Sequence, residues 1–169
     1  MDTETKLLLY KSFVTAHFNY CPAVWHACGA VNTAKLEKLQ HRALKFVYQD
    51  YTSSYESLLK RANLPTLVLS RKRLIAMEIY KAVNKLSPPY ICELFSENAP
   101  QHSYNLRKRN MCHSQKRTTK YGLLSFNHIG INIWNSLPKK LRLSVDYKQF
   151  KSMVKTWAGD CSCTFCSNG

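Results

Sequence analysis

Residues 33–49 read TAKLEKLQHRALKFVYQ, and this stretch decides the predicted fold. Its large apolar residues recur at the spacing of one helix face, which predicts an amphipathic α-helix that packs against a core. The members of this apolar stripe are Leu36, Leu39, Ala43 and Phe46, with Val47 beside them. We expect Asn32 or Thr33 to cap the helix, which then runs to about Gln49.

A stripe of basic residues repeats the same spacing, shifted by one residue. It consists of Lys35, Lys38, Arg42 and Lys45. A shift of one residue turns a side chain about 100° around a helix, so these cations lie beside the apolar stripe. We interpret them as contacts to nucleic-acid phosphates. The alternative is an ordinary solvated face of an amphipathic helix.

Helical patterns also dominate the rest of the chain. Working outward, they predict helices over about 3–19, 54–62, 66–86, 125–136 and 146–158. We expect Thr3 or Thr5 to cap the first of these helices, Ser53 or Ser54 the second, and Ser144 or Asp146 the last. The predicted buried face of the last helix consists of Tyr147, Phe150, Val154 and Trp157. We expect Leu9 and Phe13 on the buried face of the first helix, and short extended segments around 104–106 and 120–123. The predicted fold is mainly α, with two groups of amphipathic helices joined by a basic, irregular linker. The predicted boundaries are a helical domain at 1–95, the linker at 96–122, a C-terminal helical pair at 123–159 and a Cys-rich tail at 160–169.

The charge points to a polyanionic partner. The 169 residues contain 25 Lys and Arg against 10 Asp and Glu, a formal charge of +15, and strongly basic proteins most often bind nucleic acid. Residues 98–145 contain no acid at all, and such a stretch binds phosphate backbones without reading sequence. Beyond the helix at 33–49, the predicted nucleic-acid-binding residues are Arg71, Arg73, Arg107, Lys108, Arg109, Lys116 and Arg117.

The residues needed for catalysis of phosphoryl transfer are missing from the pattern. The five glycines form no nucleotide-binding loop. Metal-dependent phosphoryl transfer needs clustered carboxylates, whereas the four aspartates are isolated at Asp2, Asp50, Asp146 and Asp160. We therefore expect no enzyme activity, no catalytic residue and no organic cofactor.

The seven cysteines suggest a reducing compartment. Their number is odd, and the N-terminus does not resemble a secretory signal, so we expect a nuclear or cytoplasmic protein. No apolar run is long enough for a membrane span. Cys161, Cys163 and Cys166 have the spacing of three zinc ligands, for which Cys112 or His113 could supply the fourth. The alternative is a tail with free thiols. We expect Cys21 and Cys28 to be core thiols.

Four stretches together resemble one family. The sequence is similar to the region that follows the catalytic palm in reverse transcriptases of non-LTR (LINE-type, jockey-like) retrotransposons. The resemblance rests on LLYKSF (8–13) with HFNYC (17–21) and Val24-Trp25, on KLEKLQHRA (35–43), on PPY (88–90), and on Ser125-Phe126 with IWNSLP (133–138). Their order extends the similarity across nearly the whole chain.

The resemblance implies an origin in an RNA-directed DNA polymerase rather than an activity. In that family the polymerase site is an Asp-Asp pair in the palm, upstream of this region, and this chain has no adjacent pair of aspartates. Residues 1–95 resemble a thumb, and the helix at 33–49 would rest on the template–primer duplex. The implied partners are RNA, DNA and the palm domain.

Two other functions remain open at this point. A helical protein–protein interaction module would explain the number of large apolar residues, since a thumb without its palm exposes an apolar patch. A truncated transposon copy without function would explain the missing catalytic residues.

Overall fold

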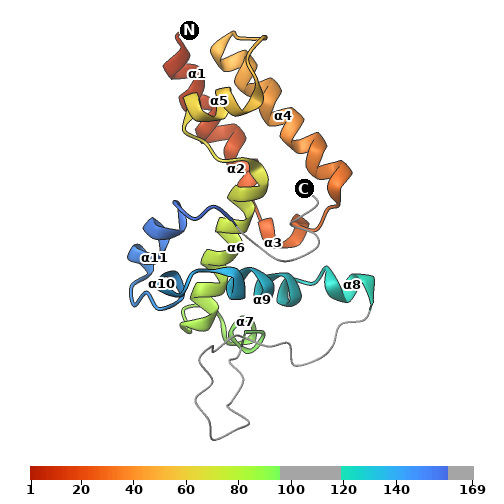
Figure 1. Cartoon of the computed structure of the whole chain (residues 1–169), viewed down its shortest axis with the longest axis vertical. Helices are drawn as coiled ribbons and strands as arrows, with labels where there is room; N and C mark the ends of the chain where they lie inside the picture. The colour runs from red at the N-terminus through yellow and green to blue at the C-terminus, as the bar shows by residue number, and fades with distance from the viewer. Residues whose placement is uncertain (96–118, 160–169) are drawn as a thin grey trace, which may run out of the picture. The chain divides into compact units, whose positions relative to one another are not determined.

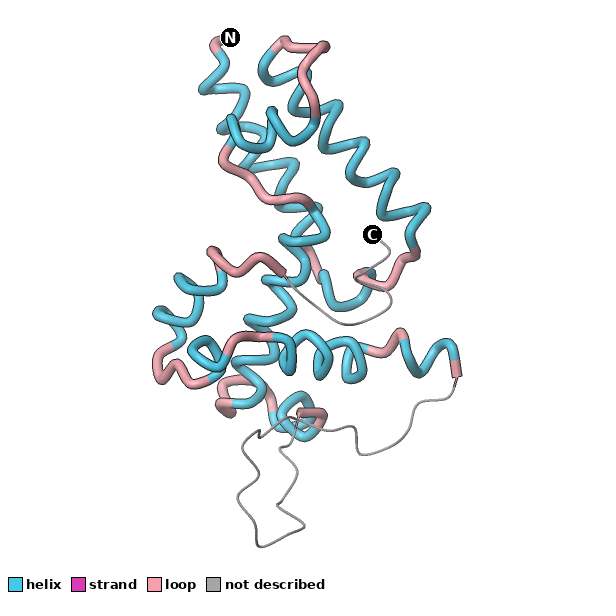
Figure 2. Tube along the Cα trace, viewed as in Figure 1, coloured by secondary structure: helices cyan, strands magenta, loops and turns pink. Residues whose placement is uncertain are grey.

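The computed structural model describes residues 1–95 and 119–159, and these residues are mainly α-helical, as predicted. Helices and loops account for all of them, and no strand occurs in these two ranges (Figures 1 and 2). The elements are α1 (Thr3–Leu9), η1 (Tyr10–Val14), α2 (Thr15–Asn19), α3 (Pro22–Trp25), α4 (Ala30–Tyr48), α5 (Tyr55–Ala62), α6 (Leu67–Val83), α7 (Pro89–Glu93), α8 (Lys120–Leu123), α9 (Phe126–Ser136), α10 (Lys139–Arg142) and α11 (Tyr147–Val154).

The chain divides into two compact units. The first unit is Met1–Arg71 and the second begins at Lys72. The division therefore falls within α6, whereas the sequence predicted the end of the first domain at residue 95. The predicted extended segment at 120–123 is wrong, because these residues form α8. The segment predicted at 104–106 lies outside the described residues.

The first helix is continuous to Asn19, as predicted, but its cap and its buried face differ. Asp2 caps it by accepting a hydrogen bond from the Thr5 backbone N–H at 3.4 Å. Around Tyr10–Val14 it widens to a π-helical turn, which changes the helical phase. Tyr10 consequently lies in the core, whereas Phe13 is 66% exposed.

Helix α4 begins earlier than predicted, at Ala30. Gly29 precedes it with φ +84°, a backbone conformation that favours glycine. The Asn32 side chain donates a hydrogen bond to the Cys28 carbonyl at 3.0 Å, which ties the first turn of α4 to the preceding loop. At the other end Gln49 adopts the left-handed conformation, and its N–H bonds carbonyls of the last turn.

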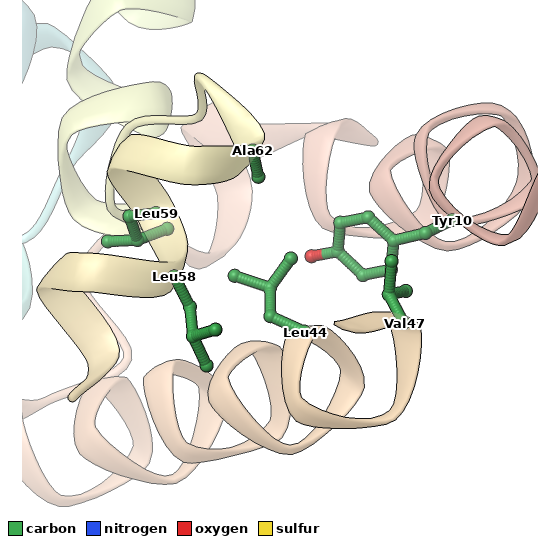
Figure 3. Packing of buried hydrophobic residues seen from close by; sticks show 6 residues of the cluster. All are labelled: Tyr10, Leu44, Val47, Leu58, Leu59 and Ala62. Atoms are coloured by element: carbon green, nitrogen blue, oxygen red, sulfur yellow. The ribbon is translucent and has the colours of Figure 1, made fainter. Parts of the chain in front are cut away.

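The core of the first unit is built by α4, α5 and the first helix. Figure 3 shows side chains of α4 and α5 converging with Tyr10. The cluster consists of Tyr10, Leu44, Val47, Leu58, Leu59 and Ala62. Helix α5 agrees with its prediction, since Ser54 caps it and it ends at Ala62.

The second unit has an aromatic and aliphatic core of its own. The Tyr80 and Phe150 rings stack with their centroids 4.2 Å apart. Gly130 permits α9 to approach Phe95, because a Cβ there would lie 2.8 Å from Phe95 Cε1. The predicted helix at 125–136 is confirmed, with Ser125 as its cap. Phe150 and Val154 confirm the predicted buried face of α11.

Candidate nucleic-acid interface

The cationic face of α4 lies in solvent. Lys35, Lys38 and Arg42 are exposed and Lys45 is half-buried. Their spacing of three, four and three residues places them along one side of the helix, over about 15 Å at 1.5 Å per residue. These side chains can therefore reach a polyanion, and their role as nucleic-acid contacts stays a prediction.

These four cations have no carboxylate partner in the described part of the chain. Within the described residues, 1–95 and 119–159, the one ion pair joins Lys81 to Glu78, with Nζ and Oε1 2.8 Å apart. The two acids that lie closest to the row in sequence are Glu37 and Asp50, and both carboxylates accept other hydrogen bonds. Within the described residues, the charge of the row is therefore free to meet an external ligand.

Glu37 holds α4 against the start of α6. Its two carboxylate oxygens accept the backbone N–H groups of Leu67 (3.2 Å) and Val68 (2.9 Å). These donors are free because the first turn of a helix has no internal acceptors for them. The acid also stands at the positive end of the α6 dipole. Glu37 is therefore a structural cap, and its charge does not neutralise the cationic face.

Tyr55 extends this polar contact into α5. Its hydroxyl donates to Glu37 Oε2 and lies 2.6 Å from Gln40 Oε1. Burial raises the pKa of Tyr55 far above its usual value, and the adjacent Glu37 carboxylate raises it further. Tyr55 therefore remains a neutral donor, and this network of α4, α5 and α6 fixes which side of α4 faces inward.

Asp50 closes the turn after α4. Its carboxylate accepts the backbone N–H of Ser53 at 3.0 Å and of Thr52 at 3.2 Å, and it accepts both hydroxyls. These hydrogen bonds, that of the Ser53 side chain first, lower the pKa of Asp50 to about 2. The charged carboxylate of Asp50 thus stabilises the turn that joins α4 to α5.

At the start of α6, Arg71 is buried, which corrects its prediction as a surface contact, while Arg73 is half-buried. Arg71 is 2% exposed, and its guanidinium lies over the Trp25 ring, 4.5 Å from the centroid. Arg73 donates from Nε (3.0 Å) and Nη2 (2.6 Å) to the Trp157 carbonyl, and burial lowers its pKa. The long stems of these residues pack inside, and Arg71 Nη1 lies 3.9 Å from the Cys28 Sγ.

The other predicted site residues lie outside the described residues. They are Arg107, Lys108, Arg109, Lys116 and Arg117 in the linker, and Cys161, Cys163 and Cys166 with Cys112 and His113 as the proposed zinc ligands. Within 1–95 and 119–159, no three His, Cys, Asp or Glu side chains come together as a metal site. The prediction of two core thiols is wrong for Cys21, which is exposed, while Cys28 is half-buried.

The inward face of α4 differs from the one that its sequence predicted. The buried residues are Thr33, Gln40, Leu44 and Val47, about 100° from the predicted apolar stripe. Thr33 and Gln40 are polar, so the sequence pattern did not identify this face as a buried one. Leu44 and Val47 could have indicated this face in the sequence, because they follow Gln40 at four and seven residues and so lie on the same side of the helix.

The comparisons with known proteins identify no relative. No family model matches the chain, and neither a curated protein nor a solved structure matches it. In the two described ranges, no helix is both long and apolar enough to cross a lipid bilayer.

Proposed function

We propose that the chain binds nucleic-acid backbones through the cationic face of α4, as a non-catalytic C-terminal region of a retrotransposon reverse transcriptase. The observation that carries the proposal is the exposed row of Lys35, Lys38 and Arg42, continued by half-buried Lys45, and this row has no carboxylate partner among the described residues. The ligand would be the phosphate backbone of an RNA template paired with a DNA primer. Contacts of this kind position a duplex without reading its bases.

The support for the enzyme family is the similarity of the four sequence stretches described above. The α-helical structure is compatible with a thumb-like region, and the exposed cations of α4 suit a helix that rests on a duplex. In this proposal the palm of the same polymerase supplies the catalytic aspartates, and the chain works in the nucleus or cytoplasm.

A salt titration tests the proposal. Four phosphate contacts predict that the logarithm of the affinity for an RNA–DNA duplex falls with the logarithm of salt concentration at a slope of about −3.6. The affinity then falls by about two orders of magnitude between 50 and 200 mM salt. Filter binding measures it. An affinity that does not change with salt would refute the proposal.

A matched pair of variants assigns the binding to α4. Changing Lys35, Lys38 and Arg42 together to Gln should reduce the magnitude of the salt slope by about 2.7, or 0.9 for each lost phosphate contact. The control changes Lys148, Lys151 and Lys155 to Gln. These exposed cations have the same spacing on and just after α11. An equal effect of both triple variants would assign binding to net charge and exclude the α4 interface.

A further inference from the structure

Helix α4 carries a partly exposed row of apolar side chains beside its cationic face, in which Ala43 also touches the core cluster. We name Leu36, Leu39, Ala43 and Phe46 the apolar seam. Leu39 is 50% and Phe46 62% exposed, while Leu36 and Ala43 are half-buried. The seam lies between the buried face of α4 and the basic row, since successive residues are about 100° apart. It is therefore an apolar surface on a helix whose orientation the core already fixes.

The spacing of the seam is that of a coiled coil. Its residues follow each other at three, four and three positions, which is the a and d pattern of a heptad repeat. Lys35 and Arg42 stand one residue before Leu36 and Ala43, in the g positions that flank such a seam. At the far end, Lys6 Nζ lies 5.6 Å from the centre of the Phe46 ring. Cations thus border the seam along one flank and at one end.

We propose that the apolar seam of α4 docks an α-helix of a partner protein whose own apolar seam is flanked by Glu or Asp. The partner's apolar side chains pack between Leu39 and Phe46. Its acids face Lys35 and Arg42, which lack carboxylate partners among the described residues. Flanking charges of this kind select the partner and its orientation.

A second copy of the chain does not meet these requirements. In an antiparallel pair the same flanks meet, so Lys35 and Arg42 of one copy face the cations of the other. In a parallel pair they face the opposite flank, which holds Gln40 and Val47, and both of these are buried in the core. The occupant is therefore a different, acidic helix.

A nucleic-acid duplex and a lipid surface fit the seam less well than a helix. A duplex presents phosphates and sugars outward, which suits the cationic row but leaves Leu39 and Phe46 in water. A lipid surface has no ridges that match the heptad spacing. The apolar seam thus favours a helix, whereas the cations beside it can face either phosphates or the acids of that helix.

The test uses the full chain and a synthetic peptide of about three heptads with Leu at a and d and Glu at e and g. The probe is measured by fluorescence anisotropy at physiological salt. We expect it to bind, and the double variant Leu39→Ser/Phe46→Ser to weaken binding at least tenfold. The control is Leu143→Ser, which changes a leucine that is 77% exposed and lies outside the seam. All three positions are exposed enough for the variants to fold.

Two further arms separate the other occupants. The same peptide with Lys at e and g should not bind, and Lys35→Glu/Arg42→Glu should reverse the preference of the two peptides. Glutamate-peptide binding that survives Leu39→Ser/Phe46→Ser would be charge attraction alone and would overturn the proposal. So would equal binding of both peptides, or tighter binding to phosphatidylserine vesicles that the double variant abolishes. The double variant should keep its duplex affinity and salt slope, which separates this test from that of nucleic-acid binding.

Discussion

The rotation of α4 about its axis predicts opposite outcomes for two leucines on the same helix. Leu44 is fully buried and Leu39 is half exposed. Leu→Ala removes about three carbon groups, or about 2.4 kcal/mol of transfer free energy at a buried site, and the cavity raises the cost to about 3–4 kcal/mol. At Leu39 about half of that transfer term applies and no closed cavity forms, so we expect about 1 kcal/mol or less.

Urea denaturation followed by far-ultraviolet circular dichroism measures the difference. With a slope of about 2 kcal/mol per molar, Leu44→Ala should lower the midpoint by about 1.5 M or more and Leu39→Ala by about 0.5 M or less. The two variants make the same chemical change on one helix, so each controls for the other. A cost of Leu39→Ala equal to that of Leu44→Ala would refute the inward face described here and restore the stripe that the sequence predicted.

Three further predictions concern single hydrogen-bonded or packed positions. Glu37→Gln weakens the cap of α6 and should cost about 1.5–3 kcal/mol in urea unfolding; an unchanged midpoint would exclude the capping role. Gly130→Ala places a Cβ 2.8 Å from Phe95 and should cost about 1–3 kcal/mol, seen as a lower melting temperature. Asp50 has its pKa lowered from 3.8 to about 2, so its stabilisation is complete above pH 3.8 and is lost as the pH falls toward 2. Asp50→Asn should flatten this part of the pH dependence of the urea midpoint, and an unchanged profile would contradict it.

The existence of the helices could be predicted from the sequence because their local signals agree. Ser54 and Ser125 accept hydrogen bonds from the first turns of α5 and α9. These caps and the apolar spacing of each segment identify the same boundaries. Such signals lie within a few residues of one another, so no knowledge of the tertiary structure is needed.

The inward face of α4 could not be predicted because tertiary hydrogen bonds choose it. Counting apolar residues favours the side with Leu36, Leu39 and Phe46. The structure instead buries Gln40, whose side chain meets Tyr55 of α5. A polar residue on a buried face becomes acceptable only when such a partner exists, and the partner is 15 residues away in the sequence.

The error at Arg71 has a similar cause. Three successive basic residues suggest a solvated surface, because isolated charges are costly to bury. Burial of Arg71 becomes tolerable through the Trp25 ring, whose face attracts the guanidinium. Trp25 is far from Arg71 in the chain, so the contact has no local signal. The candidate interface consequently loses Arg71 and retains the row on α4, while half-buried Arg73 donates to the Trp157 carbonyl.

The same tertiary network explains how one helix offers two surfaces. An amphipathic helix has one apolar face, and packing that face would have left α4 with only its cations in water. Glu37 and Gln40 turn a partly polar face inward, so the strongest apolar stripe stays outside beside the cations. Disturbing this network should therefore affect both surfaces at once, whereas Leu39→Ser/Phe46→Ser should weaken the binding of the acidic helix and leave the duplex affinity unchanged.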